Sequence, residues 1–263
     1  MTAPALALTP PLGPAGAPLL VLGPSLGTST ILWERTLPAL RSRFRVAAWD
    51  LPGHGASPGA SAPFSAADLA DAVAASIRAL GEERTLYAGV SLGGATGLEL
   101  ALRHPDLVAA LVVLASGARI GEPSAWRERA DLVRRQSTSV LVTPSAERWF
   151  APGSIARLPD LSGRLLHALR DADAESYARC CEALAAYDVR DRLGGIEIPV
   201  LALWGEHDGV APEPRAREVA VGVRDGRAAM IAGVAHLPPA EDAPATAAAL
   251  AGFFDTVSSR SAA

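Results

Sequence analysis

The sequence predicts an α/β protein with a mostly parallel, doubly wound sheet and an inserted helical cap. Two observations lead to this prediction: short, continuously apolar runs alternate with amphipathic segments, and one long stretch between two such runs has no strand signal. Strands that helices cover on both faces are apolar throughout, whereas strands with one wet face alternate. A chain of 263 residues is long enough for one domain of this class.

Each predicted element follows from a local pattern. The six apolar runs expected to be strands are 18–25, 45–50, 85–91, 109–116, 199–205 and 228–234. Helical spacing of apolar residues predicts helices over 66–81, 93–105 and 244–257. Gly81 and Pro105 stand where the first two of these helices should end, because glycine and proline stop helices. The alternation of strand and helix indicates parallel strands joined by crossover helices.

Residues 118–192 interrupt the alternation, since they contain only segments with helical spacing. A stretch of this length is too long for an ordinary loop. We therefore expect residues 118–192 to form a helical cap over the carboxyl edge of the sheet, where open α/β folds bind their ligands. The predicted core then consists of residues 1–117 and 193–263.

The composition excludes several classes of function. All 24 basic residues are arginines, so neither Schiff-base chemistry nor a lysine-containing phosphate loop is available. The net charge is only −4 and no long block of like charge occurs, so we expect neither nucleic acid nor a membrane as a partner. Cys180 and Cys181 are adjacent, an arrangement that suits neither a structural disulfide nor a metal site. We expect no metal and no cofactor.

The N-terminal segment does not read as a targeting signal. It lacks a basic start, and prolines interrupt its apolar residues. The apolar runs elsewhere are too short to span a bilayer. The expected location is therefore the cytoplasm.

The stretch "GVSLGG" places Ser91 between Gly89 and Gly93, directly after a predicted strand and before a predicted helix. Gly-x-Ser-x-Gly at such a junction is typical of a nucleophile elbow, a turn so tight that side chains at the flanking positions would collide with the strand and the helix. The helix start also favours developing negative charge. A plain turn in which Ser91 caps the helix is the alternative.

A serine nucleophile needs a histidine base, and the histidine needs an orienting carboxylate. When a nucleophile elbow carries the serine, the partners follow in the order carboxylate, then histidine. Asp208 and His236 each come directly after a predicted strand, so both belong at the same sheet edge as Ser91. Glu206, two residues before Asp208, is the alternative candidate for the carboxylate, and His207, directly before Asp208, is the alternative candidate for the base.

Acyl transfer also needs hydrogen-bond donors for the oxyanion. One is expected to be the main-chain amide of Leu92, which follows the nucleophile, and the other comes from the loop after an earlier strand. The stretch "LGPSLGTST" supplies that loop, and Leu26 is the candidate donor. A glycine- and serine-rich turn without a catalytic part is the alternative here.

The chain resembles the α/β-hydrolases, and within them the 3-oxoadipate enol-lactonases. The general resemblance rests on "SLGTS", "WDLPGHGASP", "GVSLGG", "WGEHDGVAP" and "AHLPPAEDAP". The narrower resemblance rests on the cap-side stretches 115–130, 147–153 and 177–193. Some members of this family carry a fused decarboxylase domain, and this chain is similar to the stand-alone form.

The resemblance implies hydrolysis of a small carboxylated enol-lactone to 3-oxoadipate in the catabolism of aromatic compounds. A buried substrate carboxylate requires a cation. The cap arginines that qualify are Arg119, Arg127, Arg129, Arg134 and Arg135, of which we select Arg134 and Arg135. Ser25, Trp126 and Trp149 are further candidates for binding the substrate, although tryptophans of this kind are more often core residues.

Other functions remain open at this point. The same triad serves carbon–carbon bond hydrolases, general esterases and cofactor-free perhydrolases. Epoxide hydrolases and haloalkane dehalogenases are disfavoured, because their elbow carries an aspartate where this chain has Ser91. A ligand receptor built on a hydrolase fold is the non-enzymatic alternative.

Overall fold

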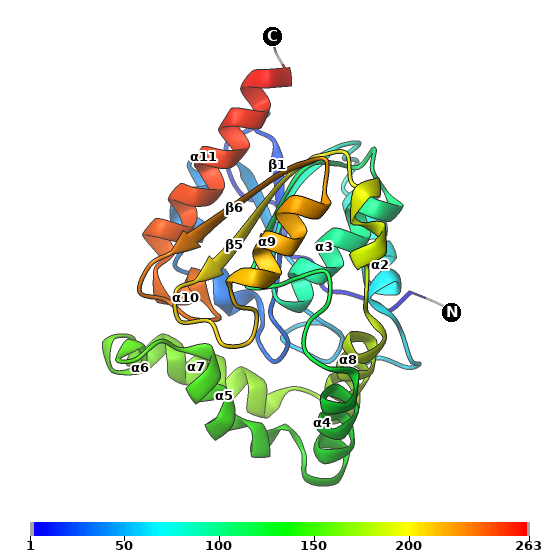
Figure 1. Cartoon of the computed structure of the whole chain (residues 1–263), viewed down its shortest axis with the longest axis vertical. Helices are drawn as coiled ribbons and strands as arrows, with labels where there is room; N and C mark the ends of the chain where they lie inside the picture. The colour runs from blue at the N-terminus through cyan, green and yellow to red at the C-terminus, as the bar shows by residue number, and fades with distance from the viewer. Residues whose placement is uncertain (1–2, 262–263) are drawn as a thin grey trace.

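The structure, a computed structural model, describes residues 3–261 and is built around a six-stranded sheet with the order β2-β1-β3-β4-β5-β6 (Figure 1). The strands are β1 Leu19–Gly23, β2 Arg45–Ala48, β3 Thr85–Val90, β4 Val108–Leu114, β5 Pro199–Gly205 and β6 Asp225–Ile231. Every pairing between neighbouring strands is parallel. The carboxyl ends of all six strands therefore meet at one edge, as predicted.

Strand β6 begins and ends three residues earlier than the predicted run 228–234. It lies at the edge of the sheet and pairs only with β5, so most of its side chains are partly exposed. Its first residues, Asp225 to Arg227, are not apolar and gave no strand signal. The end of the predicted run falls in a turn in which Gly233 has a φ of +68°.

Helices cover both faces of the sheet, which makes it doubly wound (Figure 1). One face carries α1 Leu37–Arg41 and α11 Ala243–Ser261, and the other carries α2 Ala66–Ala79, α3 Leu92–Arg103 and α9 Glu213–Gly222. The remaining core elements are the short helix α10 Pro238–Glu241 and the 3-10 turns η1 Thr30–Trp33 and η3 Arg190–Gly195. The predicted helices 66–81, 93–105 and 244–257 correspond to α2, α3 and α11.

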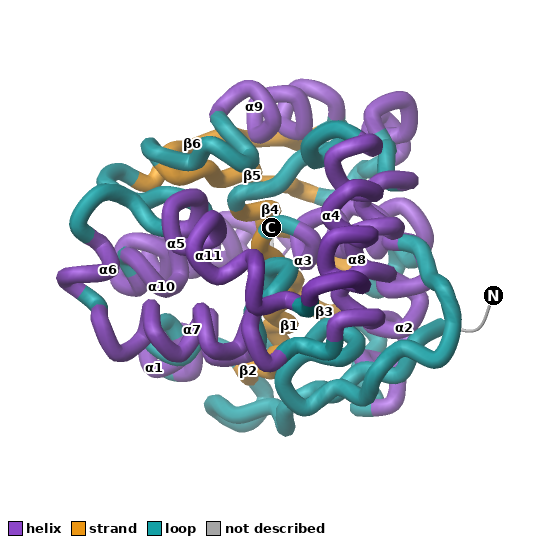
Figure 2. The backbone as a smooth tube through the Cα atoms, turned by 90° about the horizontal axis from the view of Figure 1, so that it is seen from below, coloured by secondary structure: helices purple, strands orange, loops and turns teal. Residues whose placement is uncertain are grey.

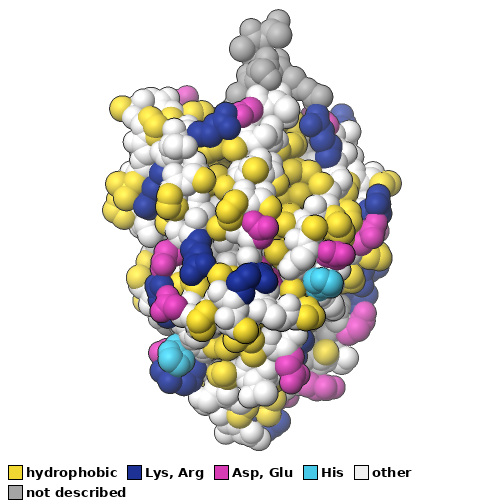
Figure 3. Space-filling view, turned by 90° about the vertical axis from the view of Figure 1, so that its left-hand side faces the viewer, with side chains coloured by type: hydrophobic (Ala, Val, Ile, Leu, Met, Phe, Trp, Pro, Cys, Tyr) yellow, Lys and Arg dark blue, Asp and Glu magenta, His cyan; other side chains and the backbone are white. Residues whose placement is uncertain are grey.

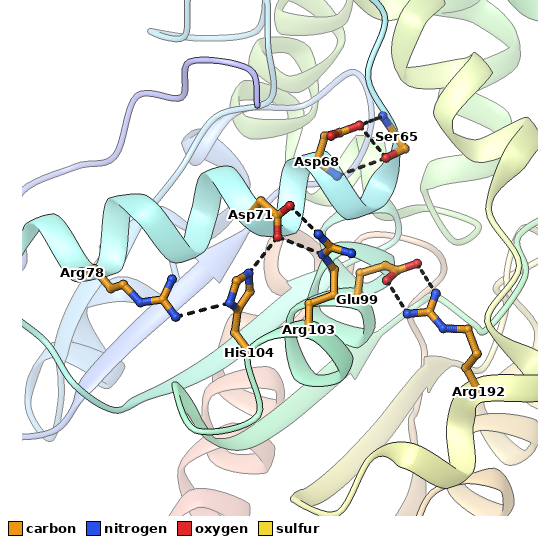
Figure 4. A network of polar contacts seen from close by, with 8 residues as sticks. All are labelled: Ser65, Asp68, Asp71, Arg78, Glu99, Arg103, His104 and Arg192. Carbon is orange, nitrogen blue, oxygen red and sulfur yellow. Dashed lines mark hydrogen bonds and ion pairs between the residues drawn. The ribbon is translucent and has the colours of Figure 1, made fainter. Parts of the chain in front are cut away.

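Polar contacts join α2 to α3 on the outside of the sheet (Figure 4). Helix α2 starts with a capping box, in which Ser65 and Asp68 each accept a hydrogen bond from the main-chain amide of the other. The carboxylate of Asp71 on α2 binds both Arg103 and His104 at the end of α3. These contacts join the C-terminal end of α3 to α2.

The segment between β4 and β5 forms the cap. Its elements are α4 Pro123–Gln136, η2 Thr138–Leu141, α5 Val142–Trp149, α6 Ser154–Arg157, α7 Pro159–Asp171 and α8 Ala174–Ala186. Helix α4 packs along α8, and the cap helices lie across the carboxyl edge of the sheet (Figure 2). The chain returns to the core at η3, where Arg192 forms a bidentate ion pair with the buried Glu99 (Figure 4).

The surface shows no separation of charge on the face drawn in Figure 3, where acidic and basic side chains are interspersed among apolar ones. In the described part of the chain, no helix is both long enough and apolar enough to cross a membrane.

Candidate active site

Ser91 occupies the turn between β3 and α3 in a strained backbone conformation, with φ 54° and ψ −115°. Such a conformation costs a non-glycine residue about 1–3 kcal/mol and is concentrated at functional sites. The turn is held by a hydrogen bond from the Ser91 amide to Leu114 (2.9 Å) and one from Ser116 Oγ to the Ser91 carbonyl (2.7 Å). The surrounding chain therefore imposes this geometry on Ser91.

The glycines on either side of Ser91 are required by close backbone contacts. A Cβ atom at Gly89 would lie 2.3 Å from the main chain of Gly93, and one at Gly93 would lie 2.6 Å from the main chain of Gly23 and Pro24. No side-chain movement relieves such contacts, because the neighbouring atoms belong to the backbone. The structure thus has the steric features of a nucleophile elbow.

His236 and Asp208 form a buried pair at the ends of neighbouring strands. His236 Nδ1 lies 3.0 and 3.1 Å from the carboxylate oxygens of Asp208, which places the ring proton on Nδ1 and leaves Nε2 to accept a proton. Burial alone would raise the pKa of Asp208. The charge and hydrogen bond of His236, aided by the amides of Ala211 and Val210, nevertheless hold that pKa below its ordinary value. Asp208 is therefore ionised near neutral pH.

Ser91 and His236 line the same cavity, which has a volume of about 180 Å³. Within residues 3–261 the structure records no hydrogen bond between Ser91 Oγ and the His236 ring. Contacts of this kind are often long in ligand-free structures and shorten when substrate is bound. The three triad candidates are thus brought together by three different strand ends.

The rival residues are directed elsewhere. Glu206 is exposed, and its carboxylate accepts a hydrogen bond from the Gly233 amide at 2.9 Å. His207 is also exposed and lines a separate surface groove beside Phe150 and Ile155. Neither residue lines the cavity that contains Ser91.

The two amides predicted to form an oxyanion hole both lack an acceptor. Leu26 lies in the cavity wall, and Leu92 is the first residue of α3. In the described part of the chain, neither amide donates a hydrogen bond to a backbone or side-chain acceptor. Buried main-chain N–H groups are almost always paired, so the amides of Leu92, which follows Ser91, and of Leu26, which lines the same cavity as Ser91, are available for a ligand oxygen.

The cap supplies most of the remaining cavity wall. Of the residues predicted to bind substrate, Ser25, Trp126 and Trp149 line the cavity. Further cap residues in the wall are Gly121, Glu122, Ala125, Arg129, Ser145, Arg148 and Tyr177. The indole of Trp126 donates a hydrogen bond to Ile120, and the guanidinium of Arg129 lies over its ring.

The structure places Arg134 and Arg135, the two arginines predicted to bind the substrate carboxylate, outside the cavity. Both are exposed on α4 and neither lines the cavity. Arg134 is held in ion pairs with Glu175 (2.8 Å) and Glu182 (2.5 Å) of α8. Trp126 and Arg129 are three positions apart on α4 and therefore share one face of the helix. Arg134 and Arg135, five and six positions after Arg129, lie on other faces.

The arginines that line the cavity are instead Arg129 and Arg148. Neither forms an ion pair with a carboxylate in the described part of the chain, and Arg148 reaches only Ser145 Oγ, at 3.5 Å. Burial and the like charge of Arg129 lower the pKa of Arg148 below its ordinary value. Arg148 is not one of the cap arginines predicted from the sequence, although it stands directly before Trp149, a predicted substrate-binding residue. Two neighbouring cations without counter-ions favour an anionic ligand.

The described residues contain no group of three or more histidine, cysteine, aspartate or glutamate side chains that is arranged to hold a metal ion.

The chain is similar to known proteins over most of its length. The family model of the alpha/beta hydrolase fold matches residues 18–140. The chain is 38% identical to 3-oxoadipate enol-lactonase 2 of Acinetobacter baylyi over 75% of this chain and 74% of that protein. It is 32% identical to a pimeloyl-[acyl-carrier protein] methyl ester esterase of Vibrio atlanticus, over 77% and 81% of the two chains. The crystal structure of the enol-lactonase from Burkholderia xenovorans LB400 superposes with a TM-score of 0.91 and 31% identity, covering 95% of this chain and 96% of that one.

Proposed function

Because the chain belongs to the α/β-hydrolase family, we propose that it is a serine hydrolase that opens a small carboxylated enol-lactone. The specific reaction proposed is the hydrolysis of 3-oxoadipate enol-lactone to 3-oxoadipate. The observation that carries the proposal is the composition of one cavity, which joins Ser91 and His236 to two arginines without carboxylate partners. The relatives named enol-lactonases support the same substrate class.

In the first half of the proposed reaction, Ser91 Oγ attacks the lactone carbonyl carbon while His236 Nε2 takes the hydroxyl proton. The amides of Leu26 and Leu92 donate hydrogen bonds to the oxyanion of the tetrahedral intermediate. The ring C–O bond then breaks, and the enol oxygen leaves as a stabilised enolate that takes the proton from His236. The acyl group remains on Ser91 as an ester.

In the second half, His236 removes a proton from water, and the resulting hydroxide attacks the acyl-serine ester. Collapse of the second tetrahedral intermediate returns the proton to Ser91 and releases a carboxylic acid, which gives its own proton to solvent and becomes a carboxylate. Asp208 keeps the imidazole in the required tautomer and stabilises its positive charge in both halves. The enol product converts to the ketone, which gives the 3-oxo acid.

The substrate carboxylate is proposed to bind Arg129 and Arg148. An arginine in a covered site is stabilised when a carboxylate neutralises it, because a half-buried cation without a partner has lost part of its hydration. Trp126 and Trp149 then provide apolar walls for the lactone ring. The small volume of the cavity, about 180 Å³, suits a substrate of this size.

The test compares the wild-type chain with Ser91→Ala on three substrates: the enol-lactone, a vinylogous diketone and p-nitrophenyl acetate. We expect lactone turnover to be fastest and to fall by at least about 10³-fold in the variant. Lactone turnover that survives Ser91→Ala would contradict the mechanism. A wild-type preference for the diketone would favour carbon–carbon bond hydrolysis instead.

The esterase relative supports a second candidate, hydrolysis of an open-chain ester. A methyl ester of a short dicarboxylic acid, assayed beside the lactone, separates the two functions. If a fluorophosphonate does not label Ser91 in the folded protein, both enzymatic proposals fail and a ligand receptor becomes the better account.

A further inference from the structure

His54 lies outside the proposed triad, in the loop between β2 and α2, and its side chain is almost completely buried. Its Nδ1 is 2.9 Å from the carbonyl oxygen of Pro52, and its Nε2 is 3.2 Å from the amide nitrogen of Gly27. A carbonyl only accepts and an amide only donates, so Nδ1 carries the proton and Nε2 holds a free lone pair. The geometry therefore defines one neutral tautomer of His54.

The hydrogen bond from Gly27 is significant because of where Gly27 lies. It directly follows Leu26, the proposed oxyanion donor from the loop after β1. Asp50, which like His54 lies in the loop after β2, makes a second hydrogen bond to this loop. Its carboxylate accepts from the Thr30 amide at 2.7 Å. The loop after β2 thus supports the loop after β1 at two points, both of which follow Leu26 in the chain.

The ring of His54 is itself held firmly. Two main-chain hydrogen bonds of 2.9 Å, from His54 to Leu51 and from Ser57 to His54, brace the loop around it. On its other side the ring stacks on Tyr177 of α8 at a centroid distance of 5.9 Å, and Tyr177 lines the cavity. A rigid acceptor of this kind restricts the peptide that it binds.

We propose that His54 is a positioning residue of the oxyanion hole: its Nε2 lone pair holds the Gly27 peptide so that the Leu26 amide stays available to the oxyanion. The proposal rests on the proposed serine-hydrolase function but not on the identity of the lactone. His54 takes no part in proton transfer, because its acceptor nitrogen is occupied and burial lowers its pKa to about 4.

The size of the effect follows from the donor that His54 positions. Loss of one oxyanion-hole donor typically lowers kcat by about 10²–10³-fold. Displacing the donor without removing it costs less, so we expect a fall of about tenfold or more when Nε2 is lost. The interaction is made mainly in the transition state, so the change is expected in kcat and not in KM.

The test separates the two contacts of the ring. His54→Phe keeps a ring to stack on Tyr177 but has no acceptor for the Gly27 amide. His54→Gln has no ring but offers an oxygen acceptor at a similar reach. His104→Gln is the matched control, because His104 is also hydrogen-bonded, to Asp71 at the far end of α3 from Ser91. Turnover of p-nitrophenyl acetate is measured for each, and fluorophosphonate titration of Ser91 gives the concentration of competent sites.

We expect His54→Phe to lose kcat by about tenfold or more with KM within about twofold, and His54→Gln and His104→Gln to remain within about threefold of wild type. A short trifluoromethyl ketone, which forms an oxyanionic hemiketal on a serine, should bind His54→Phe more weakly by a comparable factor. If His54→Phe does not fold, His54→Asn replaces it, because its shorter side chain also leaves Gly27 without an acceptor.

Three outcomes would overturn the proposal. Unchanged kcat in His54→Phe would mean that Nε2 has no effect on the oxyanion hole. Equal losses in His54→Phe and His54→Gln would show that only packing matters. A wild-type protein that neither cleaves p-nitrophenyl acetate nor is labelled at Ser91 would instead refute the proposed function, and with it any oxyanion hole.

Discussion

The main-chain amide of His236 donates a hydrogen bond of 3.2 Å to the carbonyl oxygen of Trp149. His236 belongs to the loop after β6, whereas Trp149 ends α5 in the cap and lines the cavity. The buried carboxylate of Glu241 joins the same two segments, since it accepts from Ala235 and from Ala151, each at 2.7 Å. The cap wall and the proposed base are therefore held in register by three hydrogen bonds.

Glu241→Gln should weaken this link. A glutamine side chain has one acceptor oxygen, so its NH₂ group would face one of the two buried amides. We expect a loss of about 1–3 kcal/mol in the free energy of unfolding and a lower kcat, because His236 is less well placed. Urea titration and hydrogen exchange at the Ala151 and Ala235 amides measure the effect. Glu147→Gln, at an exposed position of α5, is the control, and equal behaviour of the two variants would contradict the prediction.

Asp208→Asn should lower kcat by about 10⁴-fold, because the asparagine amide favours the wrong tautomer of His236 and does not stabilise its charge. Glu206→Gln should stay within about threefold of wild type, since within residues 3–261 the recorded hydrogen bond to that exposed carboxylate comes from the Gly233 amide, away from the cavity. Steady-state kinetics on p-nitrophenyl acetate gives the kcat of each variant for comparison with the wild type. A large loss in Glu206→Gln with little change in Asp208→Asn would reverse the assignment of the triad acid.

Arg148→Gln and Arg129→Gln should each raise KM for the carboxylated lactone by about 10–100-fold, because a hydrogen bond to a charged group contributes about 1.5–3 kcal/mol. Turnover of neutral p-nitrophenyl acetate should change little in either variant. Arg134→Gln is the matched control, as this residue pairs with Glu175 and Glu182 outside the cavity. If Arg134→Gln alone impaired lactone binding, the anchoring proposed for Arg129 and Arg148 would be wrong.

The stability of the protein should depend on the protonation of His54. The pKa of His54 falls from an ordinary 6.5 to about 4 on folding, because burial disfavours the charged ring. As pH falls below about 6.5 the unfolded chain binds this proton first, so a contribution present above that pH is lost progressively down to about pH 4. Its full size is on the order of 3 kcal/mol.

Urea titrations at about pH 7 and about pH 4.5 measure this contribution in the wild type and in His54→Gln. The variant should lose less stability on acidification than the wild type, because glutamine does not titrate. An identical pH dependence in both proteins would show that His54 is not the group responsible.

The sheet and the triad candidates could be anticipated because they depend on local signals. Buried parallel strands are continuously apolar, and Ser91, Asp208 and His236 each directly follow an apolar run or its turn, in the chain order expected for a nucleophile elbow and its partners. The shift in β6 arose where this signal is weak, since an exposed edge strand does not need apolar residues on both faces.

The proposed carboxylate anchor and the proposed positioning by His54 could not be anticipated in the same way. Which side of α4 faces the cavity is decided by its packing against α8, so the choice between Arg129 and Arg134 needed the tertiary structure. The contact between His54 and Gly27 spans 27 residues of sequence and joins two loops without regular structure. No periodic pattern encodes a contact of that kind.

The two tryptophans in the cavity wall provide an intrinsic fluorescence signal for ligand binding. Of five tryptophans in the chain, Trp126 and Trp149 come from different cap helices and line the same cavity. Trp126 lies under the guanidinium of Arg129, at 4.7 Å from the ring centroid. A carboxylate that draws this cation away from the indole would alter its emission, so occupancy of the cavity can be followed by intrinsic fluorescence without any label.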